Sequence, residues 1–177
     1  MKKATFLLFF TIVVTATVYP ENAVSRNGFT VSAEYRYFTG KVYHNKPYNW
    51  NSSTHDQTIS LYAGWFFNPC ININLGLGAG NKVGLPLFLQ SKYYFNEKKN
   101  SFYAAGEVSY RLSDKPSYYR GYDLSAFLGK ELSVSKRFAF NFHLGYSYQK
   151  AMFEIKTPDK RKENYHTLML GIAFSFK

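Results

Sequence analysis

Cysteine is almost absent from this sequence of 177 residues, in which Cys70 is the single example. One thiol excludes an intramolecular disulfide and a zinc site built from cysteines. Acidic residues are also scarce, because 11 Asp and Glu stand against 22 Lys and Arg, for a formal net charge of +11. No internal repeat, linker or low-complexity tract divides the chain. Length and composition therefore predict one domain, and the charge alone would suggest nucleic acid as a partner.

The sequence also lacks a hydrophobic run long enough for a spanning helix at its start. Residues 4–18 are uncharged and apolar, but a membrane helix needs about 20 such residues. The run follows Lys2 and Lys3, and a short basic segment before an apolar one is the pattern of a secretory signal peptide. Two small residues, Ala16 and Ala23, give alternative cleavage points.

We therefore expect a signal peptide in residues 1–23 and one mature domain in residues 24–177. An uncleaved N-terminal anchor is the alternative. Export excludes nucleic acid as a partner, because an exported protein does not meet the genome. The basic excess must then have another explanation.

A two-residue alternation fills the rest of the chain. Residues 28–38 read G-F-T-V-S-A-E-Y-R-Y-F, and successive side chains of a strand point to opposite faces, so this segment has one apolar and one polar face. The same alternation recurs in residues 58–67, 71–80, 85–95, 102–111, 122–129, 138–149 and 167–176. No charged residue interrupts the eight apolar faces.

Eight apolar faces exceed what a soluble domain of this size usually buries. Segments of about ten residues that are apolar outside and polar inside are typical of a membrane-spanning barrel, whose closure satisfies every backbone group in lipid. The links agree, because short turns at 68–70, 96–100 and 132–137 alternate with longer segments at 39–54, 113–119 and 151–164, and only the short link at 81–84 departs from this alternation. A periplasmic sandwich or a lipocalin-like barrel is the alternative.

Aromatic residues are abundant, with 16 Tyr, 17 Phe and 2 Trp. With the short turns at the inner side, the apolar faces place them in two bands, as interfacial aromatic belts require. The outer band is expected to hold Tyr37, Tyr110, Tyr122, Tyr146 and Tyr148. The inner band is expected to hold Phe29, Trp65, Phe67, Tyr93, Phe95, Phe102, Phe138, Phe140, Phe174 and Phe176.

The eight alternating segments and the ending Gly171-Ile172-Ala173-Phe174-Ser175-Phe176-Lys177 resemble the OmpA/OmpX-like barrels, most of all those of Bacteroidetes. The resemblance implies an all-β fold, an eight-stranded antiparallel up-and-down transmembrane β-barrel in the outer membrane of a Gram-negative bacterium. It also implies a monomer that contacts outer-membrane lipid and lipopolysaccharide after insertion by the barrel-assembly machinery. Lys177 after the last Phe departs from the commonest terminal signal.

Seven ionisable residues fall on the polar, inward faces. Buried charges must pair, because an isolated buried charge is very costly. They predict either an ion-paired plug that packs the lumen or a gate whose switching opens a narrow pore. Counting along the strands places Glu34, Lys92, Glu107 and His143 near mid-height, and Arg36, Arg111 and Asp123 nearer the outer mouth.

Catalytic motifs are missing. A lipid A-modifying deacylase or acyltransferase is the enzymatic alternative, but His166 is followed by Thr167 and Leu168 rather than by a placed nucleophile, and His143 faces inward. The glycines of Gly76 to Gly80 alternate on an inward strand face and do not precede a helix, so they are not a nucleotide-binding loop. We expect no catalytic residue, no metal and no cofactor.

The outer loops carry the remaining functional signal, because exposed loops on a rigid scaffold are where binding usually resides. They are expected to face lipopolysaccharide phosphates or to recognise an extracellular ligand. The sequence therefore predicts a structural or surface-interaction protein. The interaction candidates are Tyr43, Tyr48, Trp50, Lys156, Lys160, Arg161 and Lys162.

Overall fold

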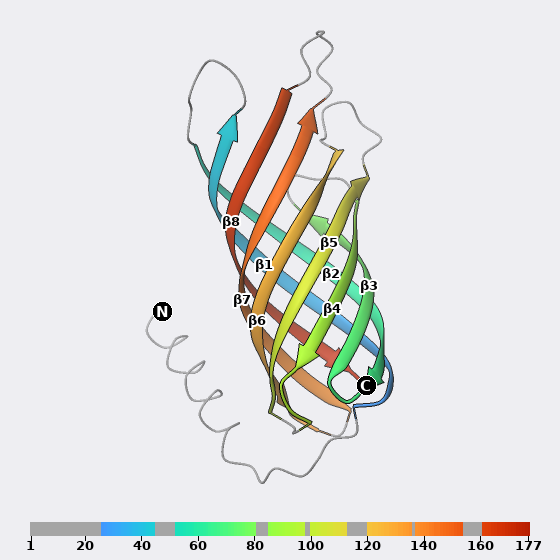
Figure 1. Ribbon diagram of the computed structural model, residues 1–177. Coiled ribbons are helices and arrows are strands. Elements are labelled where there is room, and N and C mark those ends of the chain that lie inside the picture. The colour runs from blue at the N-terminus through green and yellow to red at the C-terminus, as the bar shows by residue number, and fades with distance from the viewer. Residues whose placement is uncertain are drawn as a thin grey trace, which may run out of the picture.

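Eight antiparallel strands form a closed barrel in the computed structural model (Figure 1), and the predicted fold is confirmed. The structure describes residues 26–44, 52–80, 85–97, 100–112, 120–135, 137–153 and 161–177. The predicted signal peptide lies outside them. The strands are β1 (Gly28–His44), β2 (Ser52–Asn68), β3 (Ile71–Gly80), β4 (Leu85–Tyr94), β5 (Phe102–Leu112), β6 (Arg120–Ser133), β7 (Phe138–Phe153) and β8 (Arg161–Phe176).

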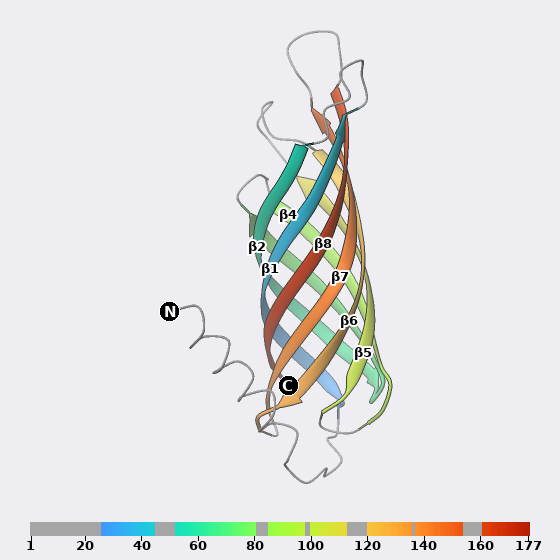
Figure 2. The same cartoon turned by 90° about the vertical axis from the view of Figure 1, so that its left-hand side faces the viewer.

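Each strand pairs with the next along the chain, and β8 returns to pair with β1. This last ladder runs from Val31 opposite Phe176 to His44 opposite Glu163, and Figure 2 shows β1 and β8 side by side. Closure leaves no sheet edge, so the backbone donors and acceptors of every strand face a neighbouring strand.

The alternation in the sequence becomes an inside-out barrel. Leu61, Leu75 and Leu144 point outward with exposed fractions of 62%, 65% and 58%, whereas their neighbours Ser60 and Asn74 are buried inside. Large apolar side chains therefore cover the exterior, and polar side chains fill the interior. A soluble sandwich or lipocalin-like barrel would place the apolar side chains inside, so the distribution contradicts that alternative.

The strands reach further than the hydrophobic pattern predicted. The segments at 39–54 and 151–164 were expected to be loops, but β1 continues to His44, β2 begins at Ser52, β7 ends at Phe153 and β8 begins at Arg161. The apolar–polar alternation stops in these extensions, because those of β1, β2 and β8 are mainly polar and that of β7 has three consecutive apolar residues, so hydropathy gave no strand signal. The ladder between β1 and β2 nevertheless continues to Val42 opposite Ser52. One side of the barrel consequently rises above the ten-residue strands β3 and β4 (Figure 1).

We call the end with the short turns the inner end and the opposite end the outer end. At the inner end, the Asn68 side-chain oxygen accepts hydrogen bonds from the backbone N–H of Cys70 at 2.8 Å and of Ile71 at 2.9 Å. This side chain fixes the tight turn between β2 and β3. The turn between β6 and β7 is shorter than predicted, because β6 continues through Ser133.

Aromatic side chains ring the exterior at both ends, as the sequence predicted. All ten residues of the inner band are exposed, including Trp65 at 53% and Phe102 at 56%. Phe138, Phe140, Phe174 and Phe176 contact one another across β7 and β8, with ring centroids 5.2–5.3 Å apart. The alternation of each strand therefore orders the rings into bands on the exterior of the barrel.

Candidate functional site

An ion-paired cluster occupies the middle of the lumen and is centred on Arg36 of β1. Arg36 Nη2 donates to Glu107 Oε2 of β5 at 2.7 Å and to the Tyr62 hydroxyl of β2 at 2.7 Å. Its Nε and Nη1 donate to Glu34 and Glu107. The side chains of Arg36, Glu34 and Glu107 are at most 2% exposed. A planar guanidinium matches two carboxylates because its donors form a fixed fork.

Neighbouring polar side chains complete this cluster. Gln90 Nε2 donates to Glu107 Oε2 at 3.0 Å, and so does the Tyr62 hydroxyl at 3.0 Å. Gln90 in turn accepts from the Asn74 amide at 3.1 Å. The carboxylate of Glu107 therefore receives hydrogen bonds from β1, β2 and β4.

Glu34 anchors the inner half of the cluster. His143 Nε2 of β7 lies 3.1 Å from Glu34 Oε1, and the other ring nitrogen of His143 lies 3.3 Å from the Tyr103 hydroxyl. Lys92 Nζ lies 5.2 Å above the Tyr103 ring. Two further basic side chains, Lys92 of β4 and His143 of β7, therefore lie on the Glu34 side of Arg36.

Aromatic rings enclose the guanidinium. Arg36 Cζ lies 5.7 Å from the ring centroid of Tyr62, 5.5 Å from that of Phe88 and 5.4 Å from that of Phe127. The rings come from β2, β4 and β6. A guanidinium surrounded by rings within about 6 Å gains cation–π attraction and loses contact with bulk water.

A separate ion pair lies toward the outer end. Arg111 Nε donates to Asp123 Oδ2 at 2.7 Å, and Ser109 Oγ donates to the same oxygen at 2.8 Å. The structure therefore places all seven predicted lumen residues inside the barrel and divides them between two groups. Arg36 was expected nearer the outer mouth with Arg111 and Asp123, but it belongs to the central cluster with Glu34 and Glu107.

A third ionic group closes the inner mouth and was missed from the sequence. Arg26 Nε donates to Glu131 Oε1 at 3.1 Å, and Lys177 Nζ donates to the same oxygen at 2.5 Å. The Tyr94 hydroxyl donates to Glu131 Oε2 at 3.2 Å, and Arg26 Cζ lies 4.3 Å from the Tyr94 ring centroid. Burial lowers the pKa of Lys177, whereas the charge of Glu131 acts to raise it.

One signal could have located part of this inner group. Glu131 continues the inward face that begins with Asp123, two residues beyond the predicted segment 122–129. Arg26 precedes the first alternating segment, and Lys177 follows the last strand. Only their positions in the closed barrel bring the three together.

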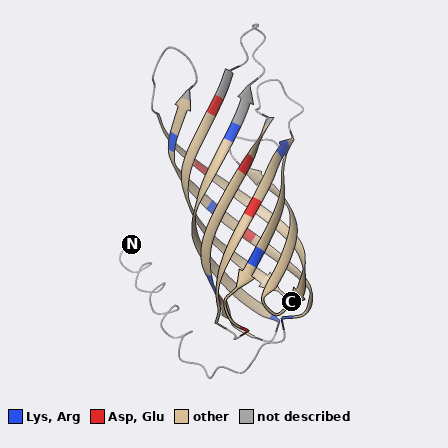
Figure 3. Ribbon diagram, viewed as in Figure 1, with Lys and Arg blue, Asp and Glu red and all other residues tan. Residues whose placement is uncertain are grey.

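The described strand carboxylates lie on one surface of the barrel only, whereas cations lie on both. Figure 3 marks the charged positions along the strands. Every strand carboxylate whose side chain the structure describes is buried inside the barrel, whereas Lys41, Lys130 and Lys150 occupy outward positions. The six inward carboxylates are Glu34, Asp56, Glu107, Asp123, Glu131 and Glu163. On these strands the exterior is therefore purely cationic wherever it is charged.

The outer end of the exterior carries a cluster of rings around His166 of β8. The Tyr43 and Tyr148 ring centroids lie 5.1 and 5.2 Å from that of His166, and the Tyr146 hydroxyl is hydrogen-bonded to His166 Nδ1. Lys41 stands opposite His166 in the ladder between β1 and β8. Tyr43 was expected in a loop but belongs to β1, and it is 42% exposed.

The structure does not describe the side chains of the other loop candidates. Tyr48, Trp50, Lys156 and Lys160 lie outside the described residues. Arg161 and Lys162 begin β8, but their side chains also lie outside the described part of the structure. Their predicted role in interaction stays a prediction.

Histidine contacts bear on the enzymatic alternative. His55 Nδ1 is hydrogen-bonded to the Tyr37 hydroxyl at 2.8 Å, and His143 lies against Glu34 and Tyr103. With His166 hydrogen-bonded to Tyr146, these three imidazoles have phenols and a carboxylate as neighbours.

In the described ranges, no three His, Cys, Asp or Glu side chains come close enough to hold a metal ion. The same ranges contain no helix long and apolar enough to cross a membrane.

No family model and no curated protein matches this chain. Among solved structures, the chain is similar to the outer membrane protein OprG from Pseudomonas aeruginosa, with 14% identity and a TM-score of 0.52 over 87% of this chain and 98% of that one. It is also similar to Neisserial surface protein A, with 15% identity and a TM-score of 0.56 over 82% of this chain and 96% of that one. These likenesses show a shared barrel fold. The resemblance to OmpA/OmpX-like barrels of Bacteroidetes stays a prediction.

Proposed function

We propose that the protein is an integral outer-membrane barrel with a closed lumen, which acts as a rigid scaffold in the cell envelope and catalyses nothing. One observation carries the closed lumen. Arg36 lies on β1 and Glu107 on β5, four strands apart in a ring of eight, and the two side chains meet. Their ion pair therefore crosses the full width of the barrel, and rings from β2, β4 and β6 fill the space around it.

The outer-membrane location is supported by the surfaces and by the fold. An exterior of exposed leucines between two aromatic bands suits a hydrocarbon layer bounded by two interfaces. The solved structures that share the fold carry the names of an outer membrane protein and a surface protein. Cations at the outer end, including Lys41 and Lys150, would face the phosphates of lipopolysaccharide, and the tyrosines around His166 would lie at the same interface.

Membrane fractionation gives the direct test of this location. We expect the protein in the outer-membrane fraction, and we expect an unheated sample to run faster on a gel than a boiled one, because a closed barrel resists unfolding by detergent. The periplasmic fraction is run on the same gel for comparison. A periplasmic product whose mobility is unchanged by boiling would contradict the proposal.

A narrow gated pore is the second candidate function. It is favoured by the position of Lys92 and His143, which are additional basic groups beside the Glu34 side of the central cluster. An exchange of partners by Glu34 would free Arg36 from one side of the lumen. The closed ion pair between Arg36 and Glu107 argues for the scaffold instead.

Conductance in planar lipid bilayers distinguishes the two. We expect silent membranes from the unmodified protein and from the variants Glu34→Ala and Lys92→Ala, because Arg36 and Glu107 still span the lumen in both. Gel mobility before and after boiling checks that each variant is inserted and folded. Discrete openings that change in frequency in either variant would support the gate and contradict the scaffold.

A further inference from the structure

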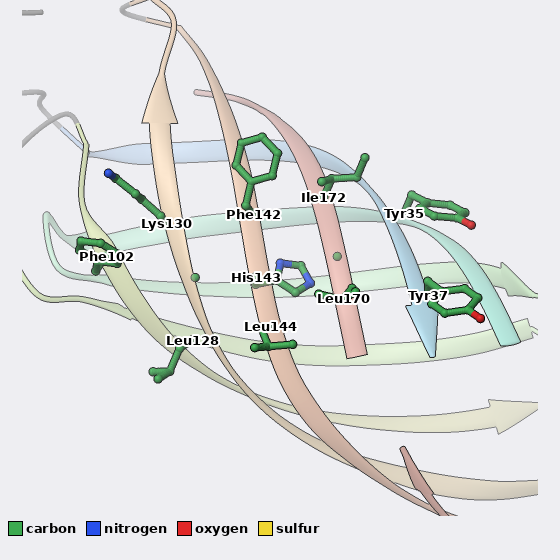
Figure 4. Close-up of a pocket in the computed structure, with 12 residues that line it drawn as sticks. Tyr35, Tyr37, Phe102, Leu128, Lys130, Phe142, His143, Leu144, Leu170 and Ile172 are labelled. Carbon is green, nitrogen blue, oxygen red and sulfur yellow. The ribbon is translucent and has the colours of Figure 1, made fainter. Parts of the chain in front are cut away.

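A groove of about 730 Å³ runs across the exterior of the barrel from β5 to β1. Figure 4 shows its labelled side chains, with Lys130 and Phe102 at one end and Tyr35 and Tyr37 at the other. Its two walls are rows of outward side chains that the strand register aligns. Lys130, Phe142, Ile172 and Tyr35 are successive partners in one row, and Leu128, Leu144, Leu170 and Tyr37 are successive partners in the other.

The floor of the groove is backbone between these rows. Gly129 of β6 and Gly171 of β8 lie there, on either side of His143 in the register. Strands in a sheet are about 4.8 Å apart, so the four spacings from β5 to β1 give a length of about 19 Å. One leaflet of a bilayer is about 15 Å deep, which is half of the hydrocarbon core. The groove is therefore long enough for one acyl chain that lies obliquely.

The two ends of the groove lie at different depths. Phe102 is the first residue of β5, and Lys130 lies three residues before the inner end of β6. Tyr35 lies seven residues above the inner end of β1, within the apolar band. The groove thus begins at the inner interface and rises into the hydrocarbon region, in the order in which a phospholipid places its headgroup and its chain.

Charge complementarity identifies the occupant at the inner end. Lys130 Nζ lies 5.1 Å from the Phe102 ring centroid, which holds the ammonium over the mouth of the groove. All strand carboxylates with described side chains point into the barrel. Among the described strand residues, none therefore neutralises Lys130 on the exterior. A lipid phosphate is the anion present at this depth of a membrane.

We propose that this groove binds one glycerophospholipid of the inner leaflet, with its phosphate on Lys130 and one acyl chain between the two rows. The proposal rests on the membrane location proposed above. The far end is held in shape, because the Tyr37 hydroxyl is hydrogen-bonded to His55 Nδ1 at 2.8 Å. A preformed site of this kind loses little entropy when an acyl chain enters it.

Native mass spectrometry of the full chain, released from detergent micelles that contain phosphatidylglycerol, tests the proposal. We expect one retained lipid per barrel. Lys130→Gln removes the charged partner of the phosphate and should lower retention about tenfold or more, since hydrogen bonds to charged groups are stronger than those between neutral groups. Leu144→Trp fills the groove from its wall and should lower retention with Lys130 in place.

Two controls separate the site from general attraction to lipid. Lys150→Gln removes an exterior cation at the outer end and should leave retention unchanged. Diacylglycerol lacks the phosphate. We expect the unmodified protein to retain diacylglycerol no better than the variant Lys130→Gln retains phosphatidylglycerol. Equal losses in Lys130→Gln and Lys150→Gln, or full retention in Leu144→Trp, would overturn the proposal.

Each variant must first show the gel shift on boiling, which reports the folded barrel independently of lipid. Absence of that shift in the unmodified protein would count against the membrane location itself. A normal shift without a retained lipid would count against the groove alone. The two failures are therefore distinguishable.

Discussion

Replacing Arg36 with methionine should lower the free energy of unfolding by about 3–5 kcal/mol, because it removes one partner of a buried ionic cluster. Methionine has a similar length and fits among the rings of Phe88 and Phe127, so the change removes charge more than volume. Glu34 and Glu107 would then be left as two buried carboxylates on opposite sides of the lumen. The loss reflects a Glu107 carboxylate without a cationic partner and a Glu34 carboxylate left with only His143 and Lys92 nearby, rather than the strength of the original ion pair.

Urea-induced unfolding from lipid vesicles would measure this effect, with tryptophan fluorescence as the signal. Trp65 lies on the outward face of β2, where it is 53% exposed, so under the proposed membrane location its emission should change when the barrel unfolds. The triple variant Arg36→Met, Glu34→Gln, Glu107→Gln is the matched control. It should regain part of the lost stability, because neutral amides are far less costly to bury than carboxylates, while Lys92 then stays buried without the neighbouring charge of Glu34. A loss below about 1 kcal/mol in Arg36→Met would mean that water solvates the carboxylates, and it would contradict a dry, closed lumen.

Replacing Leu61 with arginine should cost about 2–4 kcal/mol of stability in a bilayer. Leu61 lies outward in the middle of β2, between Ala33 of β1 and Leu77 of β3 in the register, and it is 62% exposed. An arginine there would have to place its charge within the hydrocarbon layer. The same substitution on a water-facing surface would change stability by no more than about 0.5 kcal/mol.

Tyr43→Arg is the control for this second substitution. Tyr43 also points outward, but it lies near the outer end of β1 beside Asn164 of β8, where the cost should fall to about 0–1 kcal/mol. Both variants can be compared in the same vesicle unfolding measurement. Equal costs at the two depths would mean that the exterior does not face a hydrocarbon layer, which would contradict the membrane location.

The fold could be predicted from the sequence because the side-chain period of a strand is two, and an apolar face between polar turns reports where the chain meets lipid. Leu61 and Leu144 were placed outward, and Glu34 and Glu107 inward, by counting alone. The same signal ends where both faces become polar. This is why Tyr43 was expected in a loop, although the ladder of β1 continues past it.

The partners within the lumen could not be predicted in the same way. Alternation gives the face of each residue but neither its height nor its direction around the barrel, both of which depend on strand tilt and register. Arg36 therefore appeared to belong with Arg111, and Tyr62 was not recognised as a ligand of Glu107. The exterior groove could not be predicted for the same reason, because its two rows of side chains align only through the register of β1, β6, β7 and β8.

The ladder between β1 and β8 has a consequence for the order of assembly. Thr30 Oγ1 donates to the carbonyl oxygen of Phe176, 146 positions away, so the final seam joins segments that are far apart in the sequence. Contacts of such long range form slowly, because the intervening chain must be ordered before they return any free energy. Until β8 meets β1, two strands present unpaired backbone edges that can pair with other chains. Pairing of β8 with β1 is therefore the step that removes both open edges at once.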